Sequence, residues 1–221
     1  MTSTDPSGKI SNPPTVVTQG EATIKRAPDQ AWLSIATETR DTRADGARRK
    51  SAETMTNIQA KLLATGLSVD AIRTTGYRLT PETEWKNGRG TVKGYLVRNQ
   101  IELRVDKLDK LSDVIDTANA TRDTALSISG PRFALKDEKT VETEALQLAV
   151  QAAITRAKAI ATGAGKTLGE IVRIEEQNLG HVREPFIMRT MAAKSEEATE
   201  TPIVPGDIEV RVMVVFTVEL R

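Results

Sequence analysis

Apolar and polar residues alternate in several segments of the chain, and the last segment shows the clearest alternation. Every second position between residues 208 and 220 is apolar, which predicts a strand with one wholly apolar face. This face comprises Ile208, Val210, Val212, Val214, Phe216, Val218 and Leu220. The opposite face mixes charged residues with Met213 and Val215, a pattern typical of a central strand or of a strand at an interface.

Two β-hairpins are predicted earlier in the chain. Extended runs within residues 16–39 flank Ala27-Pro28-Asp29, which predicts that the two runs pair across this turn. A longer hairpin is predicted from an extended run at residues 72–85, a turn at residues 86–90 and clean alternation up to Val105. Shorter strands are expected near residues 126–135 and 171–176.

Two amphipathic helices are predicted between these strands. The first begins at a capping box formed by Thr42 and Asp45, ends at Gly66, and has an apolar stripe of Ala47, Ser51, Met55, Ile58 and Leu62. The second is expected to be capped by Asp106, with an apolar stripe of Leu108, Leu111, Ile115 and Ala118.

A third, longer helix is predicted from about Asp137 to Ala164. Its apolar face is expected to contain Leu146, Val150, Ala153, Ala157 and Ile160. The small alanine side chains on this face favour a close approach to a sheet.

Together these elements predict an α+β fold, a mainly antiparallel sheet with about three helices packed on one face. Residues 1–14 are rich in Ser, Thr, Pro and Gly and are interpreted as a flexible leader, followed by a single domain at residues 15–221. The irregular stretch at residues 180–201 is predicted to be a mobile loop.

Charge and hydropathy narrow the class of protein. The 31 basic and 30 acidic residues nearly cancel and are interleaved, which argues against a nucleic-acid partner. No segment is apolar for long enough to predict a transmembrane helix. The first residues lack the basic and apolar regions of a signal peptide, so we expect either a cytoplasmic protein or one whose signal peptide has been removed.

The absence of cysteine excludes disulfides, thiolate nucleophiles and thiolate metal sites. His181 is the only histidine, so neither a zinc site with several imidazole ligands nor an identifiable Ser-His-Asp triad is predicted. The string Ala164-Gly165-Lys166-Thr167 resembles the end of a P-loop, but it follows a helix and is better interpreted as a helix stop. No catalytic residue, metal ligand or cofactor is therefore predicted, although a pair of carboxylates acting as acid and base stays open.

Two groups of residues are candidates for an interface. Trp85 lies beside the predicted turn, and Tyr77 and Tyr95 are expected to face one another further along the same hairpin. Trp85 either packs across the hairpin or anchors a partner subunit. Apolar residues without a regular period occur in the predicted loop. The complete candidate interface is Trp85, Phe186, Met188, Met191, Met213 and Val215.

Several short strings follow one another in a characteristic order from Val16 onward. They are Gly20-Glu-Ala-Thr, Ala27-Pro-Asp-Gln-Ala, Thr74-Thr-Gly-Tyr-Arg-Leu, Gly94-Tyr with Asn99-Gln, Asp106-Lys-Leu-Asp-Lys-Leu, Ala157-Lys-Ala and Pro202-Ile-Val-Pro-Gly-Asp. In this order the chain resembles the SIMPL-domain family, which includes bacterial periplasmic and outer-membrane-associated immunogenic proteins and proteins linked to oxidative stress defence.

The resemblance implies an antiparallel sheet with helices on one face, a periplasmic or outer-membrane-associated location, and assembly into large oligomers in some members. It implies no catalytic residues. The leading hypothesis is a non-enzymatic cell-envelope protein that acts by self-assembly or by binding an envelope protein, with a link to stress defence. The alternative is a small-ligand-binding protein or an enzyme with a cleft of carboxylates and tyrosines.

Overall fold

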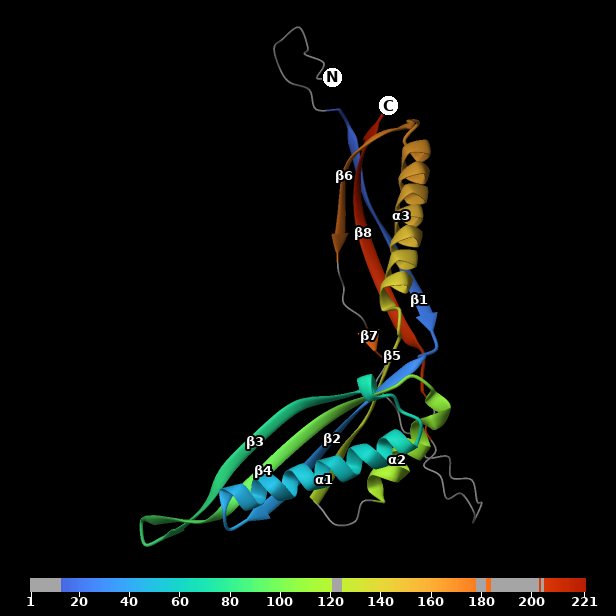
Figure 1. The fold of residues 1–221 in the computed structure, drawn as a ribbon. Coiled ribbons are helices and arrows are strands. Elements are labelled where there is room, and N and C mark those ends of the chain that lie inside the picture. Colours follow the sequence, from blue (N-terminus) through green and yellow to red (C-terminus); the bar gives the residue numbers. More distant parts are fainter. Residues whose placement is uncertain (1–12, 121–124, 178–181, 184–202, 204) are drawn as a thin grey trace, which may run out of the picture. The chain divides into compact units, whose positions relative to one another are not determined.

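The computed structural model describes residues 13–120, 125–177, 182–183, 203 and 205–221. Contacts divide the chain into two compact units. Unit 1 contains the described parts of Met1–Ala27, Asp137–Pro185 and Asp207–Arg221, and unit 2 contains those of Pro28–Lys136 and Phe186–Gly206. Each unit has its own antiparallel sheet (Figure 1).

The sheet of unit 1 is built around the last strand of the chain. Strand β8 (Ile208–Leu220) pairs on one side with β1 (Thr15–Arg26) and on the other with β6 (Leu168–Gln177) and the short β7 (Val182–Arg183). Its apolar residues from Ile208 to Val218 are buried at every second position. The alternation in the sequence therefore predicts the strand correctly, and of the two alternatives left open for it, β8 is a central strand of its sheet.

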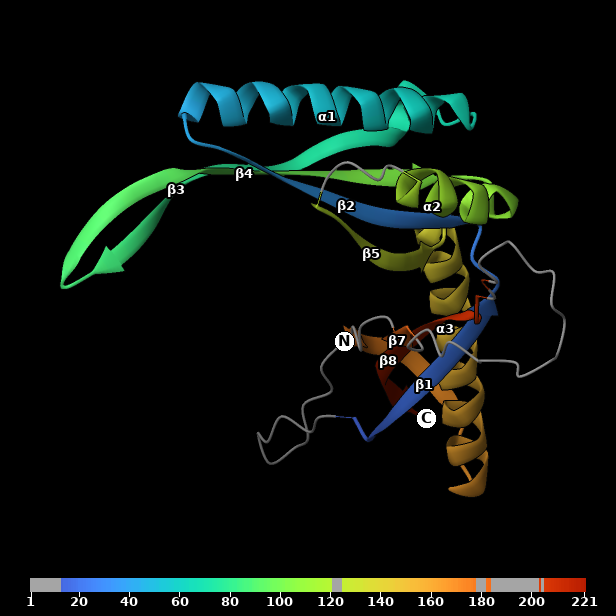
Figure 2. The same cartoon turned by 90° about the horizontal axis from the view of Figure 1, so that it is seen from below.

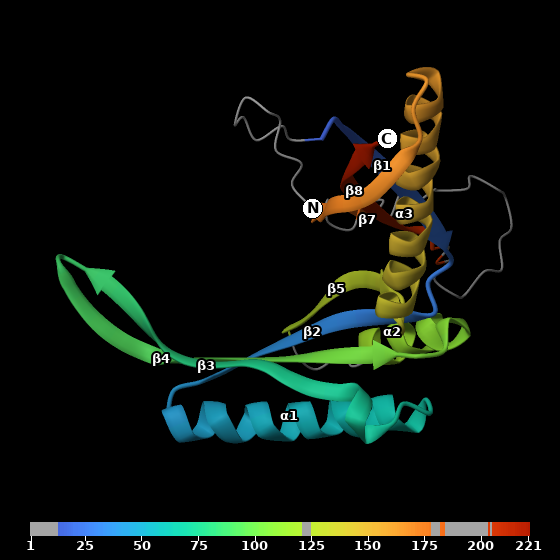
Figure 3. The same ribbon diagram turned by 90° about the horizontal axis from the view of Figure 1, so that it is seen from above.

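Helix α3 (Glu138–Gly163) packs against β1 and β8 along its length (Figure 3). Its buried residues are Ala145, Ala149, Ala153, Ala157 and Ala161. The predicted face is right for Ala153 and Ala157, but Leu146, Val150 and Ile160 lie beside it, and Ile160 is exposed. A stripe of alanines is buried because small side chains let the helix lie closer to the sheet than Leu or Ile would permit.

Gly20 of β1 lies directly against the backbone of this helix. A Cβ atom at Gly20 would lie 2.8 Å from the Cβ of Ala153 and closer still to backbone atoms of Ala149 and Ala153. Real Cβ atoms do not tolerate such separations, so the packing of α3 on β1 requires glycine at this position.

Asp137 caps the N-terminus of α3. Its carboxylate accepts hydrogen bonds from the Thr140 backbone N–H at 3.0 Å and from the Thr140 hydroxyl at 2.6 Å. These bonds, the hydroxyl first, lower the pKa of Asp137. They favour the ionised carboxylate because only that form accepts at both oxygens, and a negative charge is favourable at a helix N-terminus.

The cap predicts an acid-sensitive contribution to stability. The pKa of Asp137 is lower in the folded chain, so its stabilisation is present above the unfolded value of about 3.9 and is lost as the pH falls through the folded pKa. We expect Asp137→Ala to lower the urea midpoint at pH 7 and the difference from the wild type to shrink at pH 3. Glu53→Ala, at an exposed position of α1, is the control. An Asp137→Ala deficit of equal size at both pH values would contradict this role.

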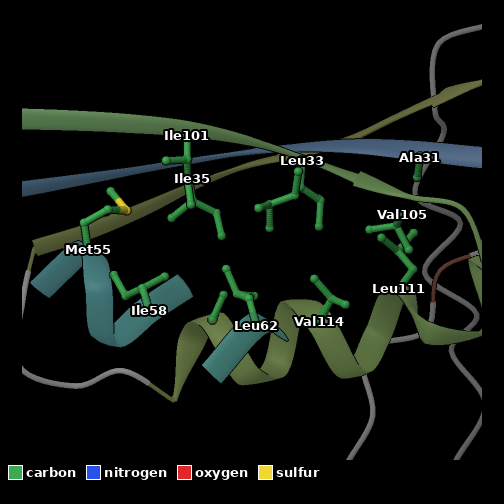
Figure 4. Packing of buried hydrophobic residues seen from close by; sticks show 12 residues of the cluster. Ala31, Leu33, Ile35, Met55, Ile58, Leu62, Ile101, Val105, Leu111 and Val114 are labelled. Atoms are coloured by element: carbon green, nitrogen blue, oxygen red, sulfur yellow. The ribbon is translucent and has the colours of Figure 1, made fainter. Parts of the chain in front are cut away.

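The sheet of unit 2 has the order β3 (Ile72–Lys86), β4 (Arg89–Val105), β2 (Gln30–Asp41) and β5 (Ala125–Ala134). Helix α1 (Ala44–Ala64) lies along one face of it (Figure 2), and helix α2 (Leu111–Asn119) packs against the same core. The 3-10 turns Val69–Ala71 and Leu108–Lys110 connect these elements. Side chains from β2, β4, α1 and α2 fill the core between the layers, including Leu33, Ile35, Met55, Ile58, Leu62, Ile101, Val105, Leu111 and Val114 (Figure 4).

The spacing of apolar residues predicts these helices well but their starts less well. The buried residues of α1 are the predicted stripe from Ala47 to Leu62 without exception. The predicted capping box is wrong, because the N-cap is Arg43, whose backbone N–H bonds to Asp41 Oδ1 at 3.0 Å. Asp106 does not cap α2 either and instead accepts hydrogen bonds from Arg104.

The first predicted hairpin is wrong. Strand β1 pairs with β8 in unit 1, whereas β2 pairs with β4 and β5 in unit 2. The turn at residues 27–29 is where the chain passes between the units. The second hairpin, β3 with β4, is confirmed.

The fold class is confirmed as α+β with antiparallel sheets. The helices are shared between two sheets, α3 on one and α1 with α2 on the other, where the sequence predicts a single sheet. Alternation reports which face of a strand is buried but carries no information on which sheet the strand joins, and this explains the difference.

Candidate functional site

The tip of the β3–β4 hairpin runs past the end of α1 (Figures 2 and 3). Asn87 and Gly88 form the turn with positive φ angles of 49° and 77°, as a tight two-residue hairpin turn requires. Trp85 pairs with Gly90, and its ring lies over that glycine, since a Cβ there would be 3.3 Å from two ring atoms. Trp85 nevertheless stays 73% exposed. It therefore packs across the hairpin and presents an aromatic surface to solvent.

The expected pair of tyrosines does not form. Tyr77 lies opposite Asn99, and Tyr95 lies opposite Pro81. Tyr77 lies further from the turn along β3 than Tyr95 does along β4, and this difference keeps the two rings apart along the ribbon.

An apolar strip on β6 is uncovered. Ile174 lies opposite the buried Phe216 and Ile171 opposite the buried Val218, so these pairs share a face of the sheet. Helix α3 packs mainly on β1 and β8, and it leaves Ile171 and Ile174 50% and 53% exposed. The intervening Val172 is exposed as well. We call these three residues the β6 strip.

The other candidate interface residues fall into two groups. Met213 and Val215 lie on the opposite face of β8 from the buried stripe and are partly exposed. Phe186, Met188 and Met191 lie outside the described residues, as does His181.

Unit 2 carries a set of arginines on the sheet face that points away from α1. Most of them are paired with carboxylates. Arg73 donates to Glu102 at 2.9 Å, and Arg104 bonds to Asp70 at 2.8 Å and to Asp106 at 3.1 Å. The hydrogen bonds from Ser68 and then Arg104 lower the pKa of Asp70.

Two arginines enclose the partly exposed indole of Trp32. The guanidinium of Arg73 lies 4.9 Å from the ring centroid, and that of Arg132 lies 5.6 Å from it. Both distances fall within the range of a cation–π interaction. The two guanidinium groups therefore hold the Trp32 ring in place on this face of the sheet.

A cavity of about 420 Å³ opens on the β3–β4 ribbon of this unit. It is lined by Gly76, Tyr77, Arg78, Arg98 and Gln100. Arg78 and Arg98 lie directly opposite each other on adjacent strands. Two positive charges therefore lie at one end of the cavity. Gly76 has no side chain, so the space beside it stays open.

The sequence does not predict this cavity, because the pairing of its two arginines depends on a β-bulge. The register shift at Glu82/Thr83 adds one residue to one strand of the hairpin. Without this shift, Arg78 would lie opposite Val97 and not opposite Arg98. No motif in the sequence marks such a bulge.

The P-loop-like string is a helix stop, because Ala164 ends α3 and Gly165 has a positive φ of 65°. Among the described residues, no group of three or more histidine and carboxylate side chains is arranged to hold a metal ion. None of the described helices combines the length and the apolar character needed to cross a bilayer.

Two antiparallel sheets, one packed against α3 and the other against α1 and α2, define an α+β protein built largely from long paired strands. The chain belongs to the SIMPL family, described as a protein of unknown function (DUF541), whose family model matches residues 16–218. The match spans strands of both units.

Several curated relatives align over most of the chain. The uncharacterized protein YggE of Edwardsiella ictaluri is 27% identical over 84% of this chain and 77% of its own length. YggE of Escherichia coli K12 is 25% identical over 90% of this chain and 82% of its own length. The 26 kDa periplasmic immunogenic protein of Brucella melitensis is 26% identical over 95% and 86%. Among solved structures, the de novo designed protein Foldit4 matches 48% of this chain and 98% of its own length at 13% identity and a TM-score of only 0.26.

Proposed function

We propose that this protein is a non-enzymatic protein of the bacterial cell envelope that acts by self-assembly or by binding another envelope protein. The observation that carries the proposal is the β6 strip, an apolar extension of a sheet whose helix covers mainly the two other long strands. Exposed apolar residues on an outer strand mark a site of association.

The periplasm is the proposed location. The Brucella relative is described as periplasmic and aligns with 95% of this chain. An absence of cysteine is compatible with that oxidising compartment. We extend the proposal to a role in stress defence that is exercised by binding, because the chain contains no cysteine to carry thiol redox chemistry.

We further propose that both units act together as the single domain at residues 15–221. The support is the family match, which covers strands of both units in one continuous span.

Assembly through the β6 strip has a direct test. A lysine at Ile174 would place a charge in the contact, and burying an unpaired charge is unfavourable. We expect light scattering on the purified wild type to give a mass above that of a 24.1 kDa monomer, and Ile174→Lys to shift it toward the monomer.

Val69→Lys is the matched control, because Val69 is also an exposed β-branched residue but lies in unit 2. It is expected to leave the mass unchanged. A wild type that stays monomeric at high concentration, and that recovers no envelope protein after cross-linking in cells, would contradict the proposal.

Trp85 is the proposed second contact. Tryptophans contribute disproportionately to protein interfaces, and this one is exposed at the hairpin tip. Trp85→Ala is expected to lower the assembled fraction in the same light-scattering experiment without unfolding the chain.

A further inference from the structure

We infer that the cavity between Arg78 and Arg98 is a binding site for the carboxylate group of a small organic acid. The inference does not depend on the assembly proposed above, because the cavity lies on the β3–β4 ribbon of unit 2 and is built from that unit alone.

The described charged side chains around the cavity carry one more positive charge than negative charge. Arg98 donates to Glu38 at 2.9 Å, and Arg40 pairs with Glu82 at 3.0 Å. Arg78, by contrast, has neither an ion pair nor a hydrogen bond from its side chain within the part of the chain that the structure describes. Among the described residues around the cavity, Arg78 is therefore a cation without a carboxylate partner.

The position of Arg78 makes this imbalance unfavourable without a ligand. Like charges placed directly opposite each other on paired strands are destabilising, and Arg78 lies opposite Arg98. An anion between the two guanidiniums would relieve the repulsion. It would also receive charge-assisted hydrogen bonds, which guanidinium groups donate in pairs to carboxylates.

The shape of the site leaves room for such a ligand. Gly76 faces Gln100 across the ribbon, and a Cβ built on Gly76 would lie 3.7 Å from the Cβ of Gln100, an ordinary contact distance. The packing of the two strands therefore does not require glycine at position 76, and the space beside Gly76 is available to a ligand. The volume of about 420 Å³ falls within the range of small-molecule sites.

The charge count selects a carboxylate over a phosphate. A carboxylate carries one negative charge and matches the single excess positive charge of Arg78, because Glu38 already compensates Arg98. A phosphate monoester carries about 1.5 to 2 negative charges near neutral pH and would leave part of its charge unmatched.

Benzoate is the probe for the test, with its neutral analogue benzyl alcohol and inorganic phosphate as comparisons. We expect a titration followed by amide NMR to show saturable shifts at Gly76, Tyr77 and Gln100 with a Kd in the millimolar range. Benzyl alcohol is expected to give no saturable shift at these amides, and phosphate to bind more weakly than benzoate.

Two variants locate the site by different means. Arg78→Gln removes the free charge, and Gly76→Val fills the space while keeping both guanidiniums. Arg78→Gln is expected to weaken benzoate binding about ten-fold or more, because it removes a hydrogen bond to a charged group. Gly76→Val is expected to weaken benzoate binding because the added side chain occupies the space of the ligand. Arg89→Gln, on the same hairpin but away from the cavity, removes the same charge and is expected to leave the Kd unchanged.

Folding of each variant is checked by its circular dichroism. Unchanged benzoate affinity in the folded Arg78→Gln protein would overturn the site, as would the absence of saturation by about 50 mM benzoate. Phosphate binding as tight as benzoate would overturn the assignment of the ligand class.

Discussion

Replacing Gly20 with valine is expected to destabilise unit 1 by about 3 kcal/mol or more, the upper range for forcing extra volume into a packed core. Strand propensity alone would predict that valine stabilises β1, because valine favours strands and glycine does not. The contact of β1 with α3 outweighs this propensity, so the free energy of unfolding is expected to fall. The added atoms would collide with the backbone of Ala149 and Ala153, and a helix backbone cannot move aside as a flexible side chain can.

Urea unfolding followed by circular dichroism at 222 nm measures this loss. Gly163→Ala is the matched control in the same unit, since a Cβ there meets nothing within 4 Å. The control is expected to be neutral or to stabilise by about 0.5–1 kcal/mol, as alanine does in a helix. A Gly20→Val protein as stable as the wild type would show that α3 does not pack closely on β1.

Leu33→Ala is expected to cost about 2–5 kcal/mol of the free energy of unfolding of unit 2. Leu33 is 1% exposed and lies in the centre of the layer between β2 and α1, where Figure 4 shows it between Ile35 and Val105. Truncation leaves a cavity lined by branched side chains that cannot all relax into it.

Tryptophan fluorescence reports this second loss, because both tryptophans lie in unit 2. Leu79→Ala on β3 is the control. Leu79 is 38% exposed, and its truncation is expected to cost about 1 kcal/mol or less. Equal effects of the two substitutions would contradict the assignment of the core.

The two experiments together test whether the units fold as one domain. In a single cooperative domain, Gly20→Val also shifts the fluorescence transition of unit 2 to lower urea. If the units unfold independently, that substitution shifts only part of the circular dichroism signal and leaves the fluorescence midpoint in place. The second result would contradict the single domain that we propose.

Periodicity in the sequence determined the elements and most of their buried faces. The stripe from Ala47 to Leu62 and the alternation from Ile208 to Val218 are both buried as predicted. These patterns are reliable because each position on a helix or strand points in a direction fixed by the backbone geometry. The absence of cysteine and the single histidine likewise restrict the available chemistry through composition alone.

Tertiary structure alone decided which strands pair and which side chains meet. Strands β1 and β2 adjoin in the sequence yet belong to different sheets, because hydrogen-bonded pairing depends on partners from distant segments. The alanine face of α3 follows from the space available above Gly20, which helical spacing does not reveal. A one-residue shift in the β3–β4 register places Arg78 opposite Arg98, and a strand's sequence does not record the bulges of its ladder.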